Sequence, residues 1–415
     1  MDDYTALHRH LGRPRGLVND ELLDAAVAAR LEETDDLDWK KPPQDPQKRK
    51  QFIHKDFLED VAAFANAGGG TIVIGVDEVD SAADHRVDAG EWTDTDVRTL
   101  RTVAASKLYP AVQGLRIHRL TATDKRAVIV VVPPSLDRPH FIQNDQQYYA
   151  ARLRVGSGSR WLSEREIAER YRLRFTEQRD AEQALERLYA RACTGVPRDR
   201  TWGIAVARPR LPLPAPAGLT ASTARALVET ARLEAESSTP EAFHHPIASV
   251  DDRAIRPGLR RWHAPSRWYP AHVQAQADLF QDGSITLAAA LGGHEVAISG
   301  YLPEGTFSSW RMETLVVDAL CLMKAVGDRT GAVDYEVRVG LAPWNAALEA
   351  KMVVSDRDYG VLSNRTVPMD IYEPVDTTVS LDAGPQGLIR QAQALATDCV
   401  NQGGVDELFA LSKRI

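Results

Sequence analysis

The stretch ETDDLDWKK, residues 33–41, places acidic side chains, one large ring and two lysines within nine positions. Leu37 and Trp39 alternate with Asp38 and Lys40, which is the two-residue period of a β-strand. Such a strand puts Asp38 and Lys40 on one face and the two apolar side chains on the other. Its chemistry depends on which other groups reach that polar face.

A second strand is predicted for TIVIGVD, residues 71–77, because it is rich in β-branched residues. On this strand Val73, Gly75 and Asp77 would share one face, and Ile72, Ile74 and Val76 would share the other. Gly75 has no side chain and leaves room beside Asp77.

If the two strands are neighbours, Glu33, Asp38 and Asp77 converge. Three carboxylates repel one another unless a cation neutralises them, and hard oxygen ligands suit Mg²⁺ or Mn²⁺. Such an ion could polarise a phosphate and deprotonate water. The alternative, which spacing alone favours, is a set of acidic turns on a solvated face.

The surrounding pattern predicts an α+β fold. Asn19 is placed to cap a helix that runs to about Glu33, and KDFLEDVAAFANA predicts a second helix that ends at the three glycines 68–70. PPQDPQKRK, with three prolines, predicts a loop. GSGSRW predicts a turn, and Ser163 is placed to cap a helix that continues to about Arg191. We expect an extension at 1–16, a first α+β domain at 17–178, a helical connector at 179–200 and a second α+β domain at 201–415.

Net charge of −8 excludes a globally basic nucleic-acid binder but not a local basic patch. Lysine runs in loops are usually only solvated, yet here one run adjoins the acidic stretch. The cations that could hold a phosphate backbone are Lys41, Lys48, Arg49, Lys50, Arg152, Arg154 and Arg160.

Other classes lack their signatures. The three cysteines form no C-x-x-C pair, so neither a zinc site nor a disulfide framework is indicated. No G-x-S-x-G elbow or P-loop is present. No signal peptide and no membrane-length apolar run are visible, so a cytoplasmic location without membrane contact is expected.

Four motifs in order carry a resemblance: ETDDLDWK, KDFLEDVAAFANAGGGTIVIGVDE, VIVVVPPSLDRPHF and YYAARLRVGSGSRWLSEREI. Together they resemble the Schlafen AlbA_2 domain over residues 17 to 175. The resemblance does not extend to residues 200 to 415.

The resemblance implies two competing functions, a DNA-binding module and a nuclease. In animal Schlafens this fold is a metal-dependent endoribonuclease acting on transfer and ribosomal RNA, and the family's site residues correspond to Glu33, Asp38 and Asp77. Lys40, which matches a family lysine, would stabilise the developing negative charge. Asp38 departs from the family's usual Glu by one methylene. Because the chain has one lobe where animal Schlafens have two, a homodimer is expected.

The prediction is therefore a metal-dependent endoribonuclease acting on structured RNA such as transfer RNA, with a role in bacterial antiviral defence or stress. The second reading is a non-catalytic DNA- or RNA-binding regulator in which the acids are structural. The third is an interaction protein whose C-terminal half senses a ligand or partner.

Overall fold

The computed structural model divides the chain into two compact units, Met1–Arg179 and Asp180–Ile415. They are called the N-terminal and C-terminal units. The structure describes residues 2–13, 15–43, 45–121, 125–143, 149–211, 213, 218–239, 244–267, 274–296, 300–302, 305–342, 350–358, 361–369 and 371–411. Both units combine helices with sheets, so the α+β prediction is confirmed.

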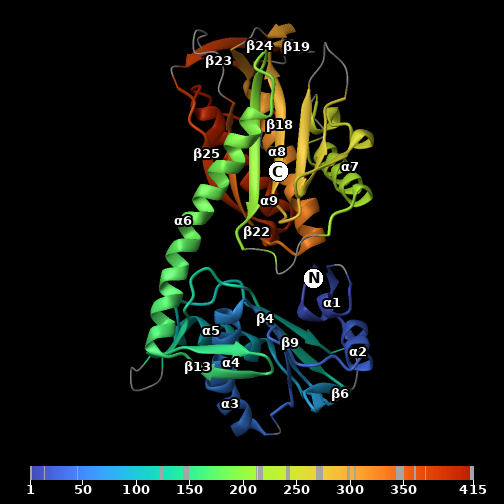
Figure 1. Cartoon of the computed structure of the whole chain (residues 1–415), viewed down its shortest axis with the longest axis vertical. Coiled ribbons are helices and arrows are strands. Elements are labelled where there is room, and N and C mark those ends of the chain that lie inside the picture. The colour runs from blue at the N-terminus through green and yellow to red at the C-terminus, as the bar shows by residue number, and fades with distance from the viewer. Residues whose placement is uncertain are drawn as a thin grey trace. The chain divides into compact units, whose positions relative to one another are not determined.

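The N-terminal unit is built around a four-stranded mixed sheet in the order β3-β4-β9-β8. Figure 1 labels two of these strands, β4 and β9. β3 (Leu37–Lys40) runs parallel to β4 (Gly70–Ile74), as the site prediction required. β4 pairs antiparallel with β9 (Ala127–Val132), which pairs antiparallel with β8 (Arg116–Leu120). All six residues of β9 are buried, which explains why its sequence is apolar without alternation.

Each face of this sheet carries its own hydrophobic core. Helices α4 (Asp56–Ala67) and α5 (Asp94–Lys107) cover one face, where Ile72 and Ile74 point. Helices α1 (Ala6–His10) and α2 (Asp20–Ala28) supply the core that holds Leu37 and Trp39. The predicted cap is confirmed, because the Asn19 side chain accepts a hydrogen bond from the Leu22 N–H at 3.0 Å.

Two local predictions are wrong for identifiable reasons. The predicted loop PPQDPQKRK contains the start of helix α3 (Pro46–His54), in which Asp45 is the N-cap and Pro46 takes the first helical position. Proline is favoured there because its missing N–H would have no helical partner. GSGSRW is only partly a turn, since β13 (Gly158–Trp161) pairs with β12 (Arg152–Val155).

The predicted single strand 71–77 is broken at Gly75, which has φ +116°. β4 therefore ends at Ile74, and β5 (Val76–Val79) pairs in a separate hairpin with β6 (Ala82–Arg86). Val76 joins the core of Val73 rather than that of Ile72 and Ile74, so the predicted sharing of faces beyond Gly75 is wrong.

The other elements of the N-terminal unit are short strands and the start of a long helix. Ser163 accepts from the N–H of Glu166 at 3.4 Å and caps α6 (Glu164–Thr194), as predicted. Part of the strand expected at QQYYAARLRV, namely residues 146–148, lies outside the described residues. The remaining strands are β1 (Asp2–Asp3), β2 (Gly16–Leu17), β7 (Leu108–Tyr109), β10 (Phe141–Gln143) and β11 (Tyr149–Ala150).

The C-terminal unit contains a seven-stranded antiparallel sheet in the order β15-β16-β17-β18-β14-β22-β25. One face packs on helices α7 (Ala221–Ser238), α8 (Ser309–Thr330) and α9 (Gly384–Asn401). The other face packs on the second half of α6. The sheet strands are β14 (Thr201–Pro209), β15 (Arg256–Gly258), β16 (Arg261–Ala264), β17 (Ala275–Phe280), β18 (Ile285–Gly292), β22 (Asp334–Leu341) and β25 (Val375–Ser380).

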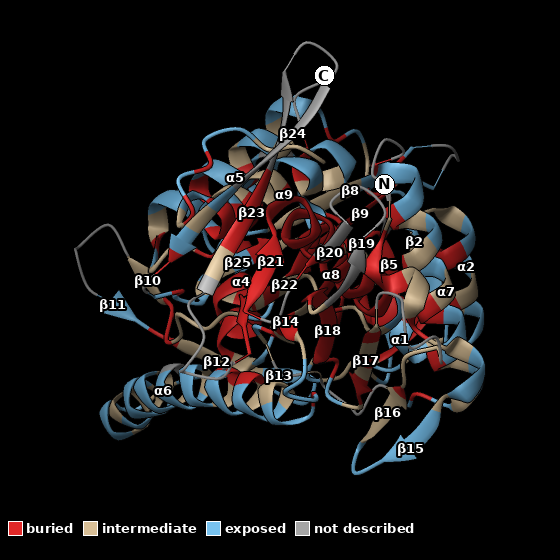
Figure 2. Ribbon diagram, turned by 90° about the horizontal axis from the view of Figure 1, so that it is seen from above, coloured by how far each residue is buried: buried red, intermediate tan, exposed pale blue. Residues whose placement is uncertain are grey.

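Burial follows these layers: α8 and β18 are almost wholly buried, whereas α6 is largely exposed (Figure 2). Smaller elements complete the unit: β19 (His294–Val296), β20 (Gly300–Leu302), β21 (Thr306–Ser308), β23 (Ala350–Asp358), β24 (Val361–Met369) and three short 3₁₀ turns at Pro246–Ser249, Asp252–Ala254 and Leu381–Ala383. Among the helices of the described ranges, none is long and apolar enough to cross a membrane.

Candidate functional site

β3 positions the acidic site by turning its apolar side chains into one core. Leu37 and Trp39 are buried against α1 and α2, and the Trp39 indole N–H donates to the Leu31 carbonyl at 3.0 Å. Asp38 consequently points to the opposite face, where it is only 2% exposed. The alternation expected for this strand is confirmed, and a buried carboxylate requires charged or hydrogen-bonding partners.

Arg154 is the main partner of Asp38. Its Nη1 donates to Asp38 Oδ1 at 2.6 Å, and its Nη2 donates to the Leu37 carbonyl at 3.0 Å. Its Nε donates to the Gly156 carbonyl at 3.0 Å, and its guanidinium lies 4.9 Å from the Phe64 ring centre. Arg154, predicted to grip RNA, is instead a 5% exposed clamp between β12 and β3.

Glu33 lies beside this ion pair. Its Oε1 accepts from the Trp39 N–H at 2.9 Å, and its Oε2 is 3.7 Å from Arg154 Nη2. Burial, together with the adjoining carboxyl of Asp38, raises the pKa of Glu33 to about 8. With this pKa the Glu33 carboxyl holds a proton at neutral pH, and the structure places it beside Asp38.

Lys40 is the exposed member of the cluster, with 32% of its side chain accessible. Its Nζ lies 2.9 Å from Asp38 Oδ2 and 3.5 Å from Asp60 Oδ2. Burial works against the ammonium charge, but the carboxylates of Asp60 and Asp38 outweigh it and raise the pKa of Lys40.

Sequence reasoning missed Asp60. It lies on α4 among Phe57, Val61 and Phe64, and burial raises its pKa to about 6. The available signal was an acidic residue on the apolar face of an amphipathic helix, a position that usually implies a nearby cation.

Asp77 does not join the cluster. Its carboxylate lies 2.8 Å from Lys41 Nζ, and that hydrogen bond lowers the pKa of Asp77. The acid of β5 whose charge reaches Glu33 is the next residue, Glu78. Glu78 takes the place predicted for Asp77 because the strand breaks at Gly75 and the pairing register is irregular between Asp77 and Glu78.

The arrangement does not fit a bound metal ion. Across the described ranges, no three His, Cys, Asp or Glu side chains are placed to hold one. Asp38 has an arginine on one oxygen and a lysine on the other. The cluster is neutralised by its own cations.

Some of the predicted phosphate-binding cations are held by contacts within the protein, and others are exposed. Arg49 donates to the Glu91 carbonyl at 2.7 Å, and Arg152 pairs with Glu59 and covers the Trp161 ring, so both are structural. Arg160 pairs with Glu166 at 2.5 Å. Lys41 and Lys48 stay 65% and 68% exposed, and the side chain of Lys50 lies outside the described residues.

Residues 33–163 match the protein-family model described as Schlafen, AlbA_2. The N-terminal unit contains a Schlafen AlbA_2 domain. The matched range begins at Glu33, the first residue of the acidic cluster, and ends at Ser163, the cap of α6. The resemblance inferred from the four motifs is thereby confirmed.

Two solved structures show weaker likenesses to the chain. The DIP2311 protein from Corynebacterium diphtheriae is 16% identical, with a TM-score of 0.25, and the match covers 36% of this chain and 27% of that one. The N-terminal domain of a RecG-related ATP-dependent DNA helicase protein from Nitrosomonas europaea is 23% identical, with a TM-score of 0.24, and the match covers 35% and 93%. These scores support no functional argument. No curated protein matches the chain.

Proposed function

We propose that the Schlafen AlbA_2 domain binds nucleic acid, and that its ligand is structured RNA such as transfer RNA. The observation that carries this is the positive charge of residues 40–55. This segment has six lysines and arginines in total and a single acid, Asp45, although the whole chain has a net charge of −8. Lys41, Lys48 and Lys55 are exposed there. Such a local cluster supplies the phosphate contacts on which affinity depends.

A second candidate function, cleavage of that RNA, is favoured by the state of Glu33. A carboxyl with a pKa of about 8 can donate a proton at neutral pH, and it lies in the same cluster as the partly exposed Lys40. When an RNA hydroxyl attacks the phosphorus, its proton would pass to water and Lys40 would stabilise the charge on the phosphate oxygens. Glu33 would protonate the leaving oxygen as its bond to phosphorus breaks. No metal ion is part of this proposal, because the carboxylates already have cation partners.

Binding is tested with purified full-length chain, a pool of transfer RNA and EDTA. Lys41→Ala/Lys48→Ala/Lys55→Ala should weaken binding and reduce the slope of log affinity against log salt by about 2–3. The matched control removes three exposed arginines elsewhere in the unit, Arg98, Arg101 and Arg179. Equal losses in both variants would contradict the assignment of this surface, and a duplex DNA of similar length tests the preference for RNA.

Cleavage is tested on a denaturing gel with EDTA, Mg²⁺ and Mn²⁺ in separate reactions. Fragments produced by the wild type, and absent with Glu33→Gln or Lys40→Met, would support the catalytic candidate. Fragments that require a divalent ion would restore the metal-dependent mechanism. If the RNA is bound but stays intact, the cleavage proposal fails and the binding proposal stands. Light scattering during size-exclusion chromatography tests the predicted homodimer.

A further inference from the structure

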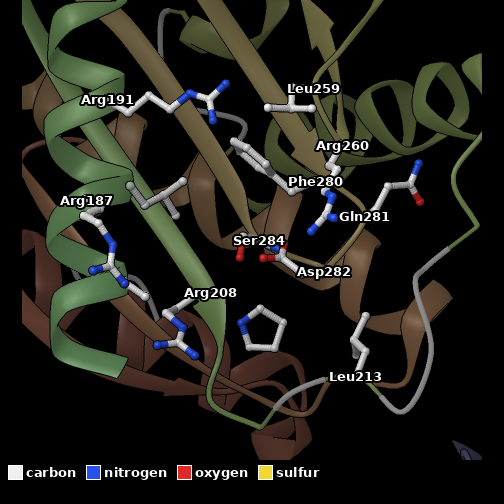
Figure 3. Close-up of a pocket in the computed structure, with 13 residues that line it drawn as sticks. Arg187, Arg191, Arg208, Leu213, Leu259, Arg260, Phe280, Gln281, Asp282 and Ser284 are labelled. Atoms are coloured by element: carbon white, nitrogen blue, oxygen red, sulfur yellow. The ribbon is translucent and has the colours of Figure 1, made fainter. Parts of the chain in front are cut away.

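The C-terminal unit contains a pocket of about 950 Å³ that the family resemblance does not cover (Figure 3). It is lined by the second half of α6, the end of β14, and the turns that join β15 to β16 and β17 to β18. Its volume lies within the range of small-molecule sites, about 300–1,000 Å³.

Four arginines line this pocket, namely Arg187 and Arg191 on α6, Arg208 on β14 and Arg260 in the β15–β16 turn. Arg208 lies 3.8 Å from Glu336, but in the described part of the chain the other three form no ion pair. The lining includes one acid, Asp282, which already accepts a hydrogen bond from the Ser284 N–H at 2.9 Å. The excess of unpaired guanidinium groups favours an anion, and their planar fork matches phosphate oxygens.

An aromatic ring adjoins these cations. Phe280 lies between Arg191 and Arg260, and the guanidinium carbon of Arg191 is 5.7 Å from its ring centre (Figure 3). Leu259, which is 78% exposed, and Leu213 extend the apolar wall. Phe280 itself is only 9% exposed, because Arg191 and Arg261 lie against its ring. A flat apolar group bound here would therefore cover mainly Leu259, whose side chain faces water.

We propose that this pocket binds a nucleoside phosphate. The phosphates contact Arg187, Arg191 and Arg208, and the base covers Leu259 beside Phe280. Inorganic phosphate would satisfy the arginines but leave the apolar wall in water, so the combination of both surfaces points to a nucleotide. This proposal is independent of RNA binding by the N-terminal unit.

The test is isothermal titration of full-length chain with ATP, GTP, CTP and UTP, beside tripolyphosphate, which has the charge but no base. At least one nucleotide should bind about tenfold or more tightly than tripolyphosphate, because the base covers apolar surface that tripolyphosphate leaves in water. Arg187→Ala/Arg191→Ala should weaken nucleotide binding about 100-fold, since each charged hydrogen bond contributes about tenfold. Leu259→Ala, which removes the exposed apolar side chain of the pocket, should reduce the preference for nucleotide over tripolyphosphate.

The matched control is Arg390→Ala, which removes an exposed arginine of α9 in the same unit and should not change affinity. Absence of nucleotide binding at about 1 mM would overturn the proposal. Equal affinity for nucleotide and tripolyphosphate would overturn it too, and this comparison uses wild-type chain only, so it holds even if a variant fails to fold. An oligonucleotide that binds through the arginines when free nucleotides do not would assign the pocket to a nucleic-acid strand instead.

Discussion

Replacing Glu33 with glutamine should make the N-terminal unit less sensitive to pH. Burial and the adjoining Asp38 raise the pKa of Glu33 from 4.5 to about 8, and the side chain is 7% exposed. Between these values the folded chain holds a proton that the unfolded chain releases. The resulting stability is complete below pH 4.5 and is lost as pH rises through 8. The slope is about 1.4 kcal/mol per pH unit, so the wild type should lose about 2–3 kcal/mol between pH 6 and pH 8.

Glutamine can replace the protonated carboxyl in both of its contacts. Its oxygen can accept from the Trp39 N–H, and its amide can donate to Asp38, so Glu33→Gln should fold and lose none of this stability over the same range. The assay is urea unfolding monitored by hydrogen exchange in peptides that contain β3. Exchange in these peptides reports on the stability of the N-terminal unit alone.

The control for this prediction is Glu32→Gln, which neutralises the exposed neighbouring glutamate and should behave as the wild type does. If wild type and Glu33→Gln lose the same stability between pH 6 and pH 8, Glu33 is ionised in the folded chain. Its assignment as a proton donor would then fail as well.

Three other predictions concern stability, and calorimetry of the N-terminal transition checks each. Arg154→Met leaves the Asp38 carboxylate buried with only Lys40, and should cost about 3–5 kcal/mol; a loss below about 1 kcal/mol would mean that water replaces the arginine. Gly75→Ala puts a side chain at φ +116° with its Cβ 3.0 Å from a backbone oxygen, and should cost about 1–3 kcal/mol. Although burial opposes it, hydrogen bonds from His118 and Arg116 hold the pKa of Asp3 at about 2. That stability is present above pH 3.8 and lost as pH falls toward 2, so Asp3→Asn should be destabilising at pH 6 and neutral near pH 2.

Local pattern was sufficient to predict the elements that carry the site. The alternation in LDWK, the cap at Asn19 and the helix before Gly68 are confirmed, because each depends on neighbours within a few positions. Proline misled the reading of residues 42–50, since the same residue that breaks a helix interior also starts a helix when an aspartate precedes it.

The composition of the site could not be predicted in this way. Gly75 can continue a strand or break it, and the choice decides whether Asp77 or Glu78 approaches Glu33. Arg154 comes from a hairpin far along the chain, so its place against Asp38 is set by tertiary packing rather than by spacing. An exposed arginine and a buried one have the same appearance in a sequence.

The clamp between Arg154 and Asp38 joins positions 116 residues apart. A ribosome adding about 5–20 residues per second needs roughly ten seconds to travel from one to the other. Throughout that interval β3 has its acids but lacks the arginine that compensates them, so Asp38 and Glu33 must remain hydrated. Glu33 can therefore become buried and protonated only after the β12–β13 hairpin has been synthesised. In a chain that stops before that hairpin, Glu33 and Asp38 would stay hydrated. A buried, protonated Glu33 therefore distinguishes a complete N-terminal unit from a truncated one.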